Sequence, residues 1–138
     1  MDCYFFNFKP ITVKEDKMKN IIIGIYSLVI GVAVITMWLI IMRGSSLAEG
    51  KIELSFHLAS EFLMATFCIV SGILVLRRKH PGRLLNMAAL GMMIYSVLNA
   101  AGYYGGRGET AAMIMFIVLA ALTLLIFRLH FPTAEEHK

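Results

Sequence analysis

Charged residues are scarce in this chain, and their scarcity excludes an ordinary water-soluble domain. Lys, Arg, Asp and Glu make up 16% of the 138 residues, whereas a typical soluble domain carries about 25%. Hydrophobic residues reach 59% and the mean hydropathy is +0.75. The few charges also gather in short clusters between long uncharged runs. The composition therefore indicates a protein of the lipid bilayer.

Cysteine is also rare, which excludes several kinds of chemistry. The two cysteines, Cys3 and Cys68, form no CxxC pair, so a disulfide framework, thiol–disulfide exchange and a thiolate zinc site all lack their ligands. Cys68 lies midway along an apolar run, where we expect it to act as a small apolar filler.

Four long uncharged runs dominate the rest of the chain. A helix needs about 20 apolar residues to cross the hydrocarbon core of a bilayer. The runs predict four transmembrane helices, at about residues 21–42, 54–76, 84–104 and 110–129. The first run is longer than the apolar core of a signal peptide, so we expect it to be retained.

The predicted spans divide the chain into a membrane domain, residues 21–131, and two polar tails, residues 1–20 and 132–138. Met18 is followed by Lys19 and Asn20, which would be a natural beginning for a membrane protein. Translation from Met18 is therefore a further hypothesis, which an intact mass would test.

Basic residues predict the orientation, because cytoplasmic connections are enriched in Lys and Arg. With the N-terminus inside, ten basic residues fall on the cytoplasmic side: Lys9, Lys14, Lys17, Lys19, Arg77, Arg78, Lys79, Arg83, Arg128 and Lys138. Three fall outside: Arg43, Lys51 and Arg107. We therefore expect a multi-pass protein of the cell membrane with both termini in the cytoplasm. The net charge of +4 then reflects orientation, and we expect no nucleic-acid partner.

The connections between the runs are short, which favours antiparallel neighbours. The predicted fold is an all-α integral membrane protein, an antiparallel up-down-up-down four-helix transmembrane bundle with both ends inside. Pro81 and Gly82 are expected to end the second helix and permit the reversal. Small residues are expected where helices touch, namely Gly24, Ser27 and Gly31 on the first helix and Gly91 and Gly102 on the third.

One polar motif interrupts the apolar runs at the start of the second. His57 and Glu61 are four residues apart and share a helical face, with Met64, Cys68 and Ser71 within about 40° of His57. An ionisable group costs at least about 2.5–3.5 kcal/mol at the bilayer centre by insertion scales. Glu61 must therefore be protonated, paired or in contact with water, so we expect it to point into the bundle.

The third run supplies candidate partners at the same depth. Tyr95 and Asn99 share one face by helical spacing, which predicts an outward-facing pocket built from His57, Glu61, Tyr95 and Asn99, with Tyr103 at its mouth. In the alternative interpretation, His57 and Glu61 pair with each other while Asn99 holds the helices together.

Aromatic residues near the predicted outer surface have a simpler interpretation. Tyr103, Tyr104 and Trp38 are typical of the aromatic belts that lie at the level of the lipid headgroups. By this interpretation they anchor the bundle in the bilayer and contact no ligand.

No metal or cofactor is expected. His57 and Glu61 supply only two ligands where a zinc site needs three or four. The remaining histidines, His80, His130 and His137, fall on the cytoplasmic side.

Three functions stay open at this point. Small-solute or proton-coupled transport is favoured, because a buried carboxylate can exchange a proton for a cation and His57 could pass that proton to water. The alternative is a non-catalytic accessory or assembly subunit of a larger membrane complex, or a homo-oligomer. An intramembrane enzyme acting on a lipid or quinone is the weaker interpretation, because no nucleophile motif such as GxSxG is present.

Overall fold

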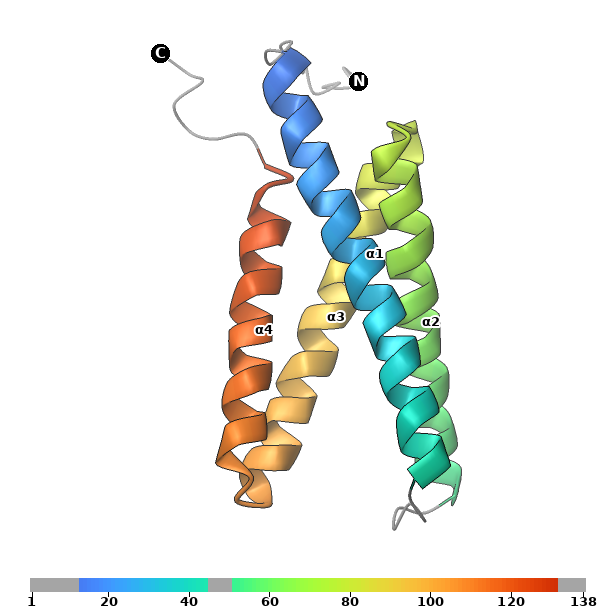
Figure 1. Cartoon of the computed structure of the whole chain (residues 1–138), viewed down its shortest axis with the longest axis vertical. Coiled ribbons are helices and arrows are strands. Elements are labelled where there is room, and N and C mark those ends of the chain that lie inside the picture. Colours follow the sequence, from blue (N-terminus) through green and yellow to red (C-terminus); the bar gives the residue numbers. More distant parts are fainter. Residues whose placement is uncertain (1–12, 45–50, 132–138) are drawn as a thin grey trace, which may run out of the picture.

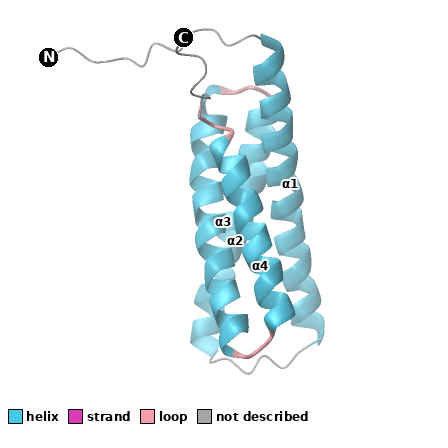
Figure 2. Ribbon diagram, turned by 90° about the vertical axis from the view of Figure 1, so that its left-hand side faces the viewer, coloured by secondary structure: helices cyan, strands magenta, loops and turns pink. Residues whose placement is uncertain are grey.

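Four α-helices form an elongated bundle. The computed structural model describes residues 13–44 and 51–131, which contain α1 (Val13–Gly44), α2 (Lys51–Leu76), α3 (His80–Gly106) and α4 (Thr110–Arg128). Consecutive helices run in opposite directions (Figure 1) along a common long axis (Figure 2). We call the end where α1 begins and α4 ends the terminal end; it also holds the α2–α3 turn. The opposite end, with the α3–α4 turn, is the distal end.

All four helices are long and apolar enough to cross a membrane, which confirms this part of the prediction. The qualifying segments are Lys17–Arg43, Ser55–Leu76, His80–Gly106 and Thr110–Arg128. Residues 1–12 and 132–138, which contain most of the predicted tails, lie outside the described residues. Helix α1 already begins at Val13, because residues 13–23 hold no Gly or Pro and several strong helix formers.

The α2–α3 turn differs from the prediction. Helix α2 ends at Leu76, and the reversal uses Arg77, Arg78 and Lys79, with Arg78 in the left-handed region at φ 52°. Pro81 lies in the first turn of α3, where its missing N–H costs nothing and its fixed φ suits a helix. Pro81 therefore lies at the start of the third helix and does not end the second.

Two hydrophobic clusters hold the helices together. In the terminal half, each helix contributes one buried side chain, namely Ile23, Val75, Leu90 and Ile126. The second cluster lies nearer the middle of the bundle and contains Met64, Cys68, Ala89, Met93, Val97 and Ala120. Cys68 and Ser71 are fully buried and Met64 nearly so, so the face predicted to carry them beyond His57 does face the interior.

Close contact between α1 and α2 depends on glycine. A Cβ atom on Gly31 would lie 2.6 Å from Ile69 Cγ1 and 2.8 Å from the Ala65 carbonyl oxygen. The predicted role of small residues on the first helix is thereby confirmed. The prediction that Gly91 and Gly102 lie at a helix contact is wrong, because a Cβ added at either residue would have no atom within 4 Å.

Helices α1 and α4 contact each other near the terminal end. Their contacts there include Ile23 with Ile126 in one cluster and a 2.7 Å hydrogen bond between the Tyr26 and Thr123 hydroxyls. Figure 1 shows the two helices diverging toward the distal end. The two helices are therefore joined near the terminal end and separate toward the distal end.

Candidate functional site

A cavity of about 850 Å³ lies in the distal half, and all four helices line it. Its wall is mostly apolar. The polar residues that contribute to the wall are His57, Glu61, Ser96, Asn99, Tyr103, Tyr104, Arg107 and Glu109. A volume of this size is within the range of small-molecule sites, about 300–1,000 Å³.

Glu61 is a buried acidic residue of this cavity. Its residue is only 8% exposed, and the Ser96 hydroxyl on α3 donates a hydrogen bond to its carboxylate Oε1. Among the described residues, no Lys, Arg or His forms an ion pair with it. The predicted inward orientation of Glu61 agrees with these contacts, although its hydrogen-bond partner is Ser96.

His57 lies one turn closer to the distal end on the same helix. Its ring contacts Trp38 edge to face, with centroids 5.5 Å apart and planes at 72°. Within the described part of the chain, no hydrogen bond or ion pair joins His57 to Glu61. The structure therefore does not bring His57 and Glu61 into the pair of the alternative interpretation.

Tyr95 does not join the cavity. It is 72% exposed, because it lies two residues, or about 200° around the helix, from the buried positions Met93 and Val97. Asn99 and Tyr103 do line the cavity, as do His57 and Glu61. The structure thus brings four of the five predicted site residues together, and Ser96 occupies the position expected for Tyr95.

Trp38 is a second departure from the sequence interpretation. An interfacial ring would be exposed, yet Trp38 is only 8% exposed and lines the cavity. Its indole Nε1 is covered and has no hydrogen-bond partner among the described residues. Tyr104 also turns inward and stacks on Phe116, with centroids 5.4 Å apart. Aromatic faces therefore form much of the wall around Glu61.

The rim of the cavity carries charges that already have partners. Arg107 donates a hydrogen bond to the Tyr103 hydroxyl, its guanidinium lies 5.2 Å from the centre of that ring, and its Nε lies 3.8 Å from Glu109 Oε1. More than half of the Arg107 and Glu109 side chains is exposed. The charges of the rim are therefore paired and in contact with solvent, whereas Glu61 lies deeper and is only 8% exposed.

A second polar cluster, near the terminal end, has no counterpart in the sequence predictions. Asn86 is fully buried, and its amide nitrogen donates to Ser27 Oγ at 2.7 Å and to Ser71 Oγ at 2.9 Å. Its oxygen Oδ1 lies 3.0 Å from His130 Nε2. The Asn86 cluster therefore connects α1, α2 and α3 to the segment that follows α4.

The hydrogen bonds of Asn86 fix the proton on His130. The amide oxygen Oδ1 can only accept a hydrogen bond, so His130 Nε2 must carry a hydrogen and donate it. His130 Nδ1 is covered and has no partner among the described residues. Burial lowers the pKa of His130, and the positive charge of Arg83 lowers it further.

The sequence did hold one signal for this cluster. Asn86 is the first strongly polar residue inside the third apolar run, and Ser27 and Ser71 lie at similar depths in their own runs. Polar residues at matching depths commonly hydrogen-bond across membrane helices. Depth alone, however, does not tell which helical faces meet.

Metal ligands are not grouped anywhere in the described part of the chain. No three His, Cys, Asp or Glu side chains there come close enough to hold an ion. The Asn86 cluster and the cavity therefore offer hydrogen bonds, one buried carboxylate and aromatic surface.

Residues 17–138 match the model of a family described as a domain of unknown function, DUF8058. The chain belongs to this family. No curated protein and no solved structure matches the chain. The DUF8058 match covers α1 from residue 17 onward, all of α2, α3 and α4, and both polar clusters, so the cavity and the Asn86 cluster lie within the family domain.

Proposed function

We propose that this DUF8058 protein is a multi-pass protein of the cell membrane that exchanges protons for a small cationic solute, with both of its ends in the cytoplasm. Four spans of sufficient length support insertion. The excess of Lys and Arg at the terminal end supports the orientation. In this arrangement the cavity opens toward the outer half of the bilayer.

The observation that carries the proposal is the environment of Glu61. A carboxylate buried without a cation among the described residues is costly in its charged form. A proton or a bound cation removes that cost, and the two compete for the same oxygen atoms. Loading the cation therefore releases the proton, and loss of the cation takes a proton up again. This competition is the elementary step of coupled exchange.

His57 and the Asn86 cluster have separate roles in the proposal. His57 lines the same cavity one turn nearer the distal end, so its imidazole relays the proton between Glu61 and outside water. The Asn86 cluster, with the Tyr26–Thr123 hydrogen bond, closes the path at the terminal end. Transport requires these bonds to open in a second conformation.

The test uses full-length protein in proteoliposomes with an acidic lumen and a trapped pH indicator. A panel of organic cations, including tetramethylammonium, ethidium and tetraphenylphosphonium, is added outside. We expect at least one cation to accelerate proton efflux saturably. Glu61→Gln should reduce that rate to the rate of protein-free vesicles, because the amide accepts the Ser96 bond but exchanges no proton.

Glu53→Gln is the matched control, since it removes the same charge from the first turn of α2. It should keep the wild-type rate. If the two variants have equal thermal stability, a lower efflux rate in Glu61→Gln comes from the missing carboxylate and not from misfolding. If no cation produces an efflux that depends on Glu61, exchange is excluded and the accessory-subunit role becomes the better explanation.

A further inference from the structure

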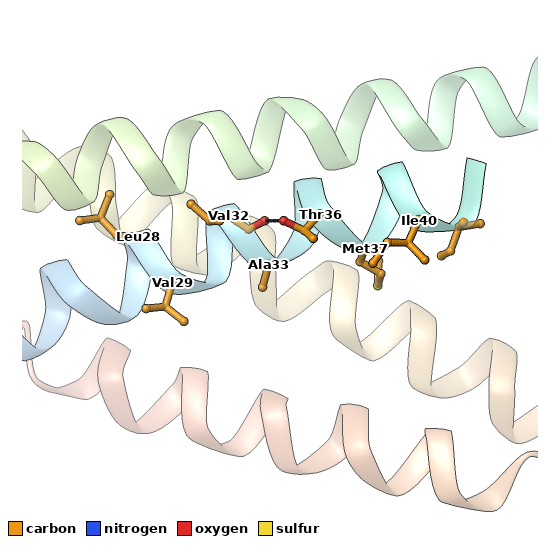
Figure 3. Close-up of a pocket in the computed structure, with 8 residues that line it drawn as sticks. Leu28, Val29, Val32, Ala33, Thr36, Met37 and Ile40 are labelled. Atoms are coloured by element: carbon orange, nitrogen blue, oxygen red, sulfur yellow. Dashed lines mark hydrogen bonds between the residues drawn. The ribbon is translucent and has the colours of Figure 1, made fainter. Parts of the chain in front are cut away.

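An apolar groove runs along the outer surface of α1 and reaches the cavity. The groove is shallow and wide open, has a volume of about 730 Å³, and among the described residues is lined only by residues of α1 between Leu28 and Ile41. Figure 3 shows these side chains along the helix, with Ala33 on the side of α4. Three residues line both the groove and the cavity: Ala33, Met37 and Ile41. The two spaces therefore share one wall.

The shared wall lies where α1 and α4 diverge. On the α4 side, the cavity is lined by Met115, Phe116 and Leu119, so both borders of the gap are apolar. The one hydroxyl in the groove, on Thr36, donates to the Val32 carbonyl oxygen of its own helix at 2.8 Å. A path between groove and cavity therefore offers no polar group that would retain a hydrophilic solute.

The cavity at the inner end of this path is acidic and aromatic, unlike the apolar path itself. Beyond the apolar border lies the Glu61 carboxylate, which has no cationic partner among the described residues, and the aromatic faces of Trp38 and Tyr104. A carboxylate attracts positive charge, and aromatic faces attract cations and apolar groups alike. The cavity thus complements a positive charge carried on a bulky apolar body.

We propose that the ligand of this cavity is a lipophilic organic cation that enters from the bilayer, between α1 and α4, past Ala33 and Met37. This inference rests on the proposed function and narrows its substrate class. A ligand that dissolves in lipid collects in the groove first. Its positive charge is then attracted into the cavity by the Glu61 carboxylate. A hydrophilic cation of equal charge lacks the first step and most of the contact area.

Ligand binding can be followed directly, because Trp38 is the single tryptophan of the chain and lines the cavity. Full-length protein in lipid nanodiscs is titrated with tetraphenylphosphonium, with tetraphenylborate of the same shape and opposite charge, and with tetramethylammonium. We expect saturable quenching of Trp38 by tetraphenylphosphonium only. Glu61→Gln should weaken that binding at least about tenfold. Equal binding of tetraphenylborate overturns the charge argument.

The entry route is tested by rate. Ala33 is exposed, so Ala33→Phe narrows the shared wall without displacing a buried neighbour. It should slow tetraphenylphosphonium binding in stopped-flow measurements at least about tenfold. Val32→Phe is the matched control, because Val32 lines the groove but not the cavity, and it should leave the rate unchanged. Equal rates in the two variants exclude entry between α1 and α4.

The two proposals fail in different ways. If tetramethylammonium binds as tightly as tetraphenylphosphonium and both depend on Glu61, the lipophilic class is overturned while proton exchange stands. If tetraphenylphosphonium and tetramethylammonium each bind equally to wild type and Glu61→Gln, the carboxylate recognises neither cation. In that case both proposals fail together.

Discussion

At the scale of single residues, His130 shows how one hydrogen bond controls a charge. Asn86 accepts from its Nε2, while its Nδ1 is covered and has no acceptor among the described residues. Protonation would place an unpaired N–H in that covered position and add a positive charge near Arg83, which itself donates to Asn20 of α1 at 3.2 Å. The fold is therefore built around the neutral ring.

The stability of the bundle should consequently fall in mild acid. Burial and Arg83 lower the pKa of His130 in the folded state below its ordinary value of 6.5. Above pH 6.5 the ring is neutral in the folded and the unfolded chain, and the fold keeps its full stability. Below 6.5 the unfolded chain binds a proton that the folded chain resists, so stability falls as the pH drops from 6.5 through the lower folded-state pKa. Thermal unfolding in detergent should thus show a lower midpoint at pH 5 than at pH 8.

His130→Gln keeps a donor for Asn86 but does not titrate. We expect it to flatten the pH dependence of the midpoint over this range. His80→Gln is the matched control, because His80 is exposed, and it should leave the dependence intact. A steep dependence that survives His130→Gln would assign the acid sensitivity to another group.

At the scale of elements, α1 and α2 pack closely because glycines let their backbones approach. Gly31 faces the Ala65 carbonyl oxygen. A Cβ added at Gly24 would lie 3.0 Å from the Gly72 carbonyl oxygen, and one added at Gly72 would lie 2.9 Å from the Gly24 carbonyl oxygen, both shorter than ordinary van der Waals contact. Backbone atoms cannot rotate away as a side-chain end can. The spacing of these two helices is therefore fixed by the absence of side chains.

Adding one methyl group tests this packing. Gly31→Ala would put a Cβ 2.8 Å from a backbone oxygen, and overpacking of this kind costs about 1–3 kcal/mol. The thermal midpoint should fall accordingly. Gly91→Ala adds the same methyl in open space and should be neutral or slightly stabilising, because alanine favours helix. Equal midpoints for the two variants would show that α1 and α2 pack less closely.

At the scale of the whole molecule, the two ends of the bundle differ. The terminal end has one core side chain from each helix and the Asn86 cluster. The distal half has the cavity, crossed by the Ser96–Glu61 hydrogen bond between α3 and α2. In the proposed orientation, the closed end of the bundle faces the cytoplasm and the cavity faces the outside.

Cysteine labelling tests that orientation. In a chain whose Cys3 and Cys68 are replaced by serine, Arg77→Cys reports the α2–α3 turn and Arg107→Cys the α3–α4 turn. Both native side chains are exposed. A membrane-impermeant maleimide added to intact bacterial cells should label only Arg107→Cys, and both variants after lysis. The reverse pattern in intact cells would invert the proposed topology.

The sequence by itself determined the number and approximate limits of the helices. A long apolar run in lipid satisfies its backbone polar groups only as a helix, and this holds whatever the run packs against. The same reasoning turned Glu61 inward, because a charge is too costly against hydrocarbon. Both results follow from the free energy of transfer from water to lipid, which depends on the residue type and not on its neighbours.

Only the tertiary structure decided which faces meet. Helix α3 is apolar around most of its circumference, so its periodicity does not mark a buried side. A rotation of about one residue separates the predicted partner Tyr95 from the observed Ser96. Helix packing set that rotation. It also decided the burial of Trp38 and the meeting of Asn86 with Ser27, Ser71 and His130. Such contacts depend on how the side chains of four helices pack together, and the sequence of one helix alone does not determine this.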